Sequence, residues 1–289
     1  HHTDLMGPMK DASLLVPPCG EEETLLAVCA YRRTGHEEEV SGEPVVLPVR
    51  PGSPFFFWNV PEGCWRVFFL YKTRKGCGGE YEWSIDMLSR DSVQVLLEAV
   101  YEPHYRHFGK YFGNTLAGFF SDEPGLYCHY VGPWGQDPDL YRRTVGQPGV
   151  ALPWSDEIPE ILRSAGISDP LSALPGLWYP IRGKSPSIRL AFMDAVTGLW
   201  SRNFSHQLGD WCRRHGVRYI GHIIEDNGAH ARLGCSGGHY FRSLDGQDMS
   251  GIDIVLHQVM PGMADYPTAA RISGGVTDPD FFHCILAQL

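Results

Sequence analysis

Short, nearly continuous apolar runs place the strongest constraint on how this chain folds. Five of them lie at Thr24–Tyr31, Trp65–Tyr71, Leu116–Phe120, Val217–Ile224 and Ile252–Leu256. Runs of this length without polar alternation are typical of parallel strands that are covered on both faces. We therefore expect these segments to be strands of a largely parallel sheet.

Stretches with helical spacing separate some of these runs. Apolar residues recur every three or four positions in Asp91–Tyr105, where Pro103 is expected to bend or end the helix. A longer helix is expected over Met193–Trp211, followed by a cationic turn and a glycine stop at Gly216. This alternation of helices and buried strands predicts an α/β fold.

The expected architecture is a TIM-type (β/α)8 barrel that is incomplete in this chain. Only five clear strands are found, whereas a closed barrel needs eight. Residues 1–289 are therefore interpreted as a partial barrel catalytic domain, with the remaining domains of a longer enzyme missing. An open doubly wound sheet is the alternative.

Two segments depart from the alternation. Residues 130–186 are rich in Pro and Gly and are interpreted as a loop insertion, or lid, over the active-site face. Its tryptophans, Trp134 among them, would either stack on a sugar or fill the core of the insertion. A short helix is expected at Glu157–Ser164, and another is expected to begin at Asp278.

The charge balance limits the class of partner. The chain has 24 Lys and Arg against 34 Asp and Glu, a formal net charge of −10. Binding to nucleic acid depends on clustered Lys and Arg, so no nucleic-acid partner is expected. A neutral substrate such as a carbohydrate fits this charge better.

The cysteines and the hydropathy indicate the compartment. The eight Cys form no CxxC pair, so a structural zinc site is not expected, and Cys29 and Cys212 are interpreted as buried thiols. No stretch is apolar enough to cross a bilayer and no signal peptide is recognised, so no membrane partner is expected. We expect a cytoplasmic protein, or a secreted or periplasmic one if a signal peptide has been lost.

The leading candidate site is the segment GFFSDEPG, in which an apolar strand runs into Asp122 and Glu123. Active sites of parallel α/β folds form at the carboxyl ends of strands. A carboxyl group beside apolar walls is held in its protonated form, as a general acid requires. A solvated acidic turn is the alternative interpretation.

A second group lies at the end of the next run: His222 is near the end of Val217–Ile224, and Glu225, Asp226 and Asn227 follow it. Glu225 is the candidate second carboxylate, because hydrolysis of a glycosidic bond needs two. Asp226 and Asn227 would hold sugar hydroxyls, and their oxygens would also suit calcium. His222 would help to position the sugar. The tetrapeptide EDNG is equally typical of a turn, which is the alternative interpretation of this segment.

A third group lies near the last strand. It comprises polar residues expected to line the same cleft and to bind substrate, namely His239, Arg242, Asp248 and His257. The histidines lack the spacing of a helical zinc motif, so no catalytic transition metal is expected. Nucleotide-binding glycine motifs are also missing from the sequence.

The two blocks around GFFSDEPG and GHIIEDNGAH resemble the large bacterial α-L-rhamnosidase-like glycoside hydrolases of family 106. The resemblance implies a TIM-type barrel flanked by β-sandwich domains and the removal of terminal sugars, often rhamnose, from polysaccharides. It also implies Glu123 as a catalytic carboxylate, Glu225 as its partner, and calcium near the site, although no cofactor is required for the reaction.

Two assignments of the second carboxylate stay open. Asp122-Glu123-Pro124 is similar to the Asn-Glu-Pro that supplies the acid/base in related barrel glycosidases. If this chain works like those Asn-Glu-Pro glycosidases, the nucleophile lies outside this chain and Glu225 only binds substrate. If the rhamnosidase resemblance governs, Glu123 and Glu225 are the pair and the enzyme inverts configuration.

The function expected from the sequence is hydrolysis of terminal glycosidic bonds by two carboxylates. Glu123 would protonate the leaving oxygen, Glu225 would activate water, and Asp122 with the polar residues named above would position the sugar. The alternatives are a catalytically silent carbohydrate-binding module and a metal-dependent hydrolase.

Overall fold

The computed structural model describes residues 1–34, 38–50, 52–74, 84–128, 144–147, 151–224, 233–234, 236–252 and 283–284. The chain divides into two compact units. The first unit comprises His1–Glu82 and Asp137–Ala195, and the second comprises Trp83–Gln136 and Val196–Leu289. Each unit is described by itself below.

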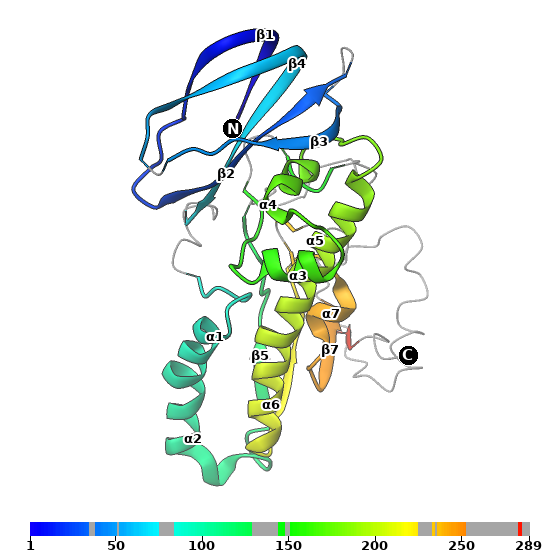
Figure 1. The fold of residues 1–289 in the computed structure, drawn as a ribbon. Helices are drawn as coiled ribbons and strands as arrows, with labels where there is room; N and C mark the ends of the chain where they lie inside the picture. Colours follow the sequence, from blue (N-terminus) through cyan, green and yellow to red (C-terminus); the bar gives the residue numbers. More distant parts are fainter. Residues whose placement is uncertain are drawn as a thin grey trace, which may run out of the picture. The chain divides into compact units, whose positions relative to one another are not determined.

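The first unit is built on a curled antiparallel sheet (Figure 1). Its four strands are β1 (His2–Leu15), β2 (Glu23–Arg33), β3 (Val40–Val46) and β4 (Phe55–Thr73). Their order in the sheet is β1-β4-β2-β3, and all three pairings are antiparallel.

Both faces of this sheet are buried where β2 pairs with β4, at residues 28–31 and 66–69. On one face Val28 lies opposite Phe69 and Ala30 opposite Val67, all at most 2% exposed. On the other face Tyr31 donates a hydrogen bond to the carbonyl oxygen of Ser172, at 2.8 Å. Because a second element covers the second face, the central strands carry almost uninterrupted apolar sequence although they are antiparallel.

Short helices from the second part of this unit provide that cover. They are α3 (Ile158–Ser164), α4 (Pro170–Ala173) and the 3₁₀ turn η4 (Leu174–Leu177). The helix expected at Glu157–Ser164 is thus confirmed as α3. The described residues of the predicted insertion, 144–147 and 151–186, belong to this unit, in which α4 contacts β2 and β3. Their suggested action as a lid stays a prediction.

The second unit begins with a helical segment made of α1 (Arg90–Leu96), the π-helical turn η2 (Leu97–Tyr101), α2 (Glu102–Phe108) and the 3₁₀ turn η3 (Gly109–Tyr111). Pro103 lies in the first turn of α2 and does not end the helical segment. A proline lacks the backbone N–H that an α-helix needs at an interior position. The wider π turn before it accommodates this loss.

The longer helical segment is also confirmed. It consists of α5 (Ser185–Trp200), the π turn η5 (Ser201–Ser205) and α6 (His206–Arg214). Gly216 follows with a φ of 73°, which is the left-handed glycine stop expected from the sequence. Cys212 on α6 is fully buried, as is Cys29 in the first unit, in agreement with their interpretation as buried thiols.

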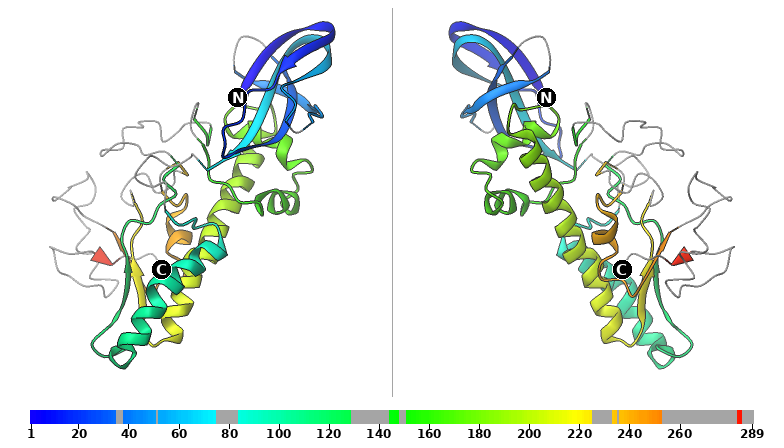
Figure 2. Two further views of the ribbon diagram at one scale, coloured as in Figure 1. Left: turned by 90° about the vertical axis from the view of Figure 1, so that its left-hand side faces the viewer. Right: turned by 90° about the vertical axis from the view of Figure 1, so that its right-hand side faces the viewer.

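A small, mainly parallel sheet completes the second unit. Its strands are β5 (Gly118–Ser121), β6 (Arg218–Gly221), β7 (Met249–Ile252) and β8 (His283–Cys284), in that order. The pairs β5–β6 and β6–β7 are parallel, and β8 is antiparallel to β7. The segments α1–α2 and α6 lie side by side against this sheet (Figure 2).

An aromatic cluster joins these helices to the sheet. The ring of Tyr101 on η2 stacks on Phe119 of β5 with centroids 4.2 Å apart, and Trp211 of α6 meets both rings edge-on. The Trp211 indole donates to Glu102 at 2.7 Å. The helices are therefore held on one face of β5 and β6.

The prediction of a (β/α)8 barrel is wrong. A barrel needs parallel strands alternating with helices, but the first sheet is wholly antiparallel and includes β1 and β3, which we did not predict. The runs at Thr24–Tyr31 and Trp65–Tyr71 are strands, yet they pair antiparallel as parts of β2 and β4. Near the chain end, His283–Cys284 are described as a strand rather than as part of the expected helix.

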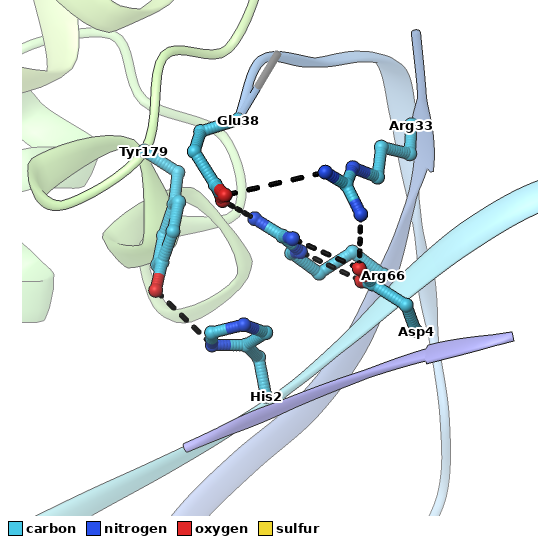
Figure 3. Close-up of polar contacts among 6 residues, drawn as sticks. All are labelled: His2, Asp4, Arg33, Glu38, Arg66 and Tyr179. Carbon is cyan, nitrogen blue, oxygen red and sulfur yellow. Dashed lines mark hydrogen bonds and ion pairs between the residues drawn. The ribbon is translucent and has the colours of Figure 1, made fainter. Parts of the chain in front are cut away.

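A buried cation in the first unit ties its strands together (Figure 3). The guanidinium of Arg66, only 3% exposed, donates to both carboxylate oxygens of Asp4 at 2.7 and 2.9 Å and pairs with Glu38. It also lies 5.0 Å from the ring centre of Tyr179. The hydrogen bond from Arg66 holds the pKa of the Asp4 carboxyl below its usual range.

We expect Arg66→Met to destabilise the first unit strongly, because it removes the buried guanidinium that joins Asp4 and Glu38 and leaves Asp4 paired with Arg33 only among the described contacts. Removing one member of a buried ion pair costs about 3–5 kcal/mol, and the partial exposure of Asp4 places the loss at the lower end. Chemical denaturation measures it. Lys72→Met is the control, because its ion pair with Asp156 is exposed and should contribute less than about 1 kcal/mol. Equal losses in the two variants would contradict this role of Arg66.

The lowered pKa of Asp4 predicts a dependence of stability on pH. A carboxyl whose pKa is depressed in the folded state stabilises it above the unfolded value, here 3.8, and loses that contribution as the pH falls through the folded pKa. We expect Asp4→Asn to reduce the slope of unfolding free energy against pH below that value. Denaturant titrations at a series of acidic pH values test this, and an unchanged slope would contradict it.

Candidate active site

The carboxyl ends of β5 and β6 lie side by side in register. Ser121 is paired with Gly221, and the ladder continues one step further, where the His222 backbone N–H approaches the Ser121 carbonyl oxygen at 3.4 Å. A Cβ atom on Gly221 would lie 2.5 Å from the same oxygen, so only glycine allows this close approach. The residues that follow both strands are therefore brought together at one edge of the sheet, as expected from the sequence.

Asp122 and His222 meet at this edge. The Nε2 atom of His222 lies 3.0 Å from Oδ1 of Asp122. The imidazole is 1% exposed, whereas the aspartate side chain is 75% exposed. When Nε2 carries the proton, the buried ring donates to the carboxylate and orients it, while the rest of the carboxylate faces outward. This arrangement suits a carboxylate that accepts hydrogen bonds from a ligand.

Polar side chains next to this edge of the sheet support it through hydrogen bonds. The Ser121 hydroxyl lies 3.0 Å from the hydroxyl of Tyr219, and burial raises the pKa of Tyr219 above its usual range, so the phenol stays neutral. With its amide oriented to suit its neighbours, Gln247 donates to the carbonyl oxygen of Gly221 at 3.0 Å. Ser121 and Tyr219 were not predicted to support the site, because each stands inside a strand and looks like an ordinary sheet residue.

Glu123 follows Asp122 in an uncommon backbone conformation. Its φ is +47°, in the left-handed region that costs a non-glycine residue on the order of 1–2 kcal/mol. Its side chain is exposed, whereas Pro124, Gly125 and Tyr127 after it are buried. Both Glu123 and Asp122 are thus exposed, which differs from the desolvated environment expected from the sequence.

The turn after Glu123 is fixed by two hydrogen bonds. The hydroxyl of Tyr127 donates to the carbonyl oxygen of Glu123 at 2.5 Å, and the N–H of Ile224 donates to the carbonyl oxygen of Pro124 at 3.2 Å. The first bond closes the turn on itself, and the second ties it to the segment that follows β6.

Two residues of the third predicted group, His239 and Arg242, have described side-chain contacts in the second unit. The Arg242 guanidinium donates to the Thr197 hydroxyl at 3.0 Å. His239 caps the helix α7 (Tyr240–Leu244) by accepting from the Arg242 N–H at 3.3 Å. The described contacts of both side chains are therefore structural.

Asp248 lies just before β7, at the end of the sheet opposite Asp122 and His222. Its carboxylate accepts from the Tyr219 N–H at 2.8 Å and from Arg213 at 3.1 Å. Its own N–H donates to the Tyr219 carbonyl oxygen, also at 2.8 Å. Asp248 therefore fastens β7 to β6.

Several candidate residues lie outside the described residues, and their predicted roles stay predictions. They are Trp134, Glu225, Asp226, Asn227 and His257. Within the described ranges no group of three or more His, Cys, Asp or Glu side chains could hold a metal ion. Calcium near the site is not supported by any described residue.

Comparison of the chain with protein-family models and with curated proteins gives no match. The resemblance to the family 106 glycoside hydrolases therefore stays an expectation from the sequence. Among the helices of the described ranges, none is long and apolar enough to span a membrane.

We expect Asp248→Ala to destabilise the second unit without a specific effect on ligand binding. It removes charge-assisted hydrogen bonds to a backbone N–H and to Arg213, a loss of about 1.5–3 kcal/mol. Asp245→Ala is the matched control, because its pair with His206 is exposed and contributes below about 1 kcal/mol. Thermal and denaturant unfolding compare the two, and the structural role is refuted if their stabilities agree.

Proposed function

We propose that this chain is the catalytic part of a glycoside hydrolase, with Glu123 as the general acid that protonates the leaving oxygen. The observation that supports the proposal most is the Asp122–His222 pair at the carboxyl edge of two parallel strands, directly beside the exposed Glu123. Ligands of open α/β sheets bind at this edge.

The two neighbouring carboxylates have different tasks in this proposal. Asp122, oriented by the buried imidazole of His222, accepts hydrogen bonds from sugar hydroxyls and holds the ring of the terminal sugar. Glu123 extends from a turn whose backbone is fixed, and it transfers its proton to the glycosidic oxygen as the bond breaks. Positioning and proton transfer are thus assigned to adjacent residues.

A second carboxylate is needed to activate water or to attack the sugar. We assign this task to Glu225, which directly follows Ile224 in the sequence. The described part of its segment, His222 to Ile224, runs alongside Ser121 to Pro124 through two backbone hydrogen bonds. On this assignment water attacks from the opposite side of the sugar and the configuration at the anomeric carbon inverts.

The substrate class follows from the charge and from the sequence resemblance. A net charge of −10 disfavours polyanionic substrates and suits a neutral glycoside. α-L-Rhamnosides are the first substrates to test, because the enzymes that the two sequence blocks resemble often remove rhamnose. No metal ion takes part in the proposed steps.

The proposal predicts that Glu123→Gln abolishes most of the activity. The amide keeps the shape of the side chain but cannot donate the proton, so kcat on phenyl α-L-rhamnoside should fall by about 10²–10⁴-fold. Initial rates over a panel of phenyl glycosides measure the effect.

Glu98→Gln is the matched control. Glu98 is an exposed glutamate of the same unit, on η2, and it accepts an exposed hydrogen bond from Gln94 at 3.0 Å. This variant should keep the full rate. Hydrolysis by Glu123→Gln at the rate of the unchanged chain would refute the proposed role of Glu123.

A further inference from the structure

The turn from Glu123 to Tyr127 is bracketed by two residues in the left-handed region. Of the three non-glycine residues with positive φ in the described ranges, two are Glu123, at +47°, and Tyr127, at +48°. Neither residue type favours this conformation, which is common only for glycine and less rare for Asn and Asp. Such backbone strain persists only where the surrounding structure enforces it.

One side chain of the turn enforces it directly. The Tyr127 hydroxyl donates to the carbonyl oxygen of Glu123 at 2.5 Å, and the tyrosine is only 7% exposed. The peptide plane that carries this oxygen turns with the backbone dihedrals of Glu123. A buried donor fixed on the oxygen therefore restrains the conformation that decides where the Glu123 side chain points.

The backbone of the turn that carries the Tyr127 donor is itself held in place. Pro124 and Gly125 are buried, and the Pro124 carbonyl oxygen accepts from Ile224 at 3.2 Å. The backbone of the turn is thus anchored to the segment after β6, and Glu123 at the start of the turn is exposed.

We infer that Tyr127 is a positioning residue, whose hydroxyl holds Glu123 in its left-handed conformation and so aims its carboxyl group at the substrate. The inference rests on the proposed function for its effect on catalysis, but its structural part can be tested alone. A displacement of about 1 Å of a catalytic group can cost about 10²-fold in rate, so the effect should be measurable.

Tyr127→Phe is the test variant, because it removes the hydroxyl and keeps the ring. Its crystal structure, solved with the complete chain, should show Glu123 outside the left-handed region. On phenyl α-L-rhamnoside we expect kcat to fall by about 10- to 100-fold with little change in KM. On the 2,4-dinitrophenyl glycoside the fall should be smaller than about threefold, because this leaving group needs no protonation.

The dependence on the leaving group separates positioning from loss of stability. Tyr31→Phe is the matched control, because it also removes one buried hydroxyl donor to a backbone carbonyl oxygen, that of Ser172 in the first unit. It should lower the melting temperature without any difference between the two substrates. In a Glu123→Gln background, Tyr127→Phe should change the rate less than about twofold, because the two residues act through one group.

The two possible failures are distinguishable. If Glu123→Gln hydrolyses the panel at the rate of the unchanged chain, the proposed function is wrong. If Tyr127→Phe keeps Glu123 at a positive φ, or slows both substrates equally, the inference about Tyr127 is wrong whatever the outcome for Glu123→Gln. A change of φ together with a selective loss on the phenyl substrate supports both.

Discussion

The in-register parallel pairing of β5 and β6 is the constraint on which the candidate site depends. Two parallel strands end at the same edge of a sheet, so residues that follow them are neighbours although 100 positions separate Asp122 from His222. A shift of the register by one residue would place the side chains after Ser121 and Gly221 on opposite faces. Gly221 secures this register, because its missing side chain leaves room for the Ser121 carbonyl oxygen.

The burial of polar groups at this edge follows a gradient. Tyr219 is fully buried, the His222 side chain is 1% exposed, and the Asp122 side chain is 75% exposed. Buried polar groups need partners to offset the loss of hydration, and each of these has a hydrogen bond to the next layer or to a neighbouring strand. Exposure of the outermost carboxylate leaves it free to exchange water for a ligand at little cost.

The sequence located most of the segments but not their orientation. Apolar runs without alternation show that both faces of a strand are buried, and the first unit meets this condition with an antiparallel sheet covered by α4. The strand β1 was missed because most of its residues are exposed, so its sequence carries no continuous apolar run. The charge of Arg66 inside an apolar strand was likewise unexplained until Asp4, 62 positions away, proved to be its partner.

Some site residues could likewise be placed from their local sequence, whereas the place of others depends on contacts with distant parts of the chain. Asp122 and His222 could be paired from the sequence, because both follow apolar runs whose strands are parallel. Asp248 could not be placed, because the strand β7 begins at Met249, earlier than the run that marked it, and this puts the carboxylate at the opposite edge. Tyr127 gave no periodic signal, since its role depends on one hydrogen bond across a turn.

The exposure of Glu123 bears on how a general acid could work at this edge. Transfer of a carboxyl group out of water favours its neutral form, and the sequence led us to expect apolar strand residues to provide that environment. Glu123 is instead an exposed residue at the start of a turn whose next two residues are buried. In that case the bound sugar, held by Asp122, would displace water from the carboxyl group of Glu123 and so desolvate it. A rigid turn is needed in such an arrangement, because a substrate can cover a group only where that group is held in place.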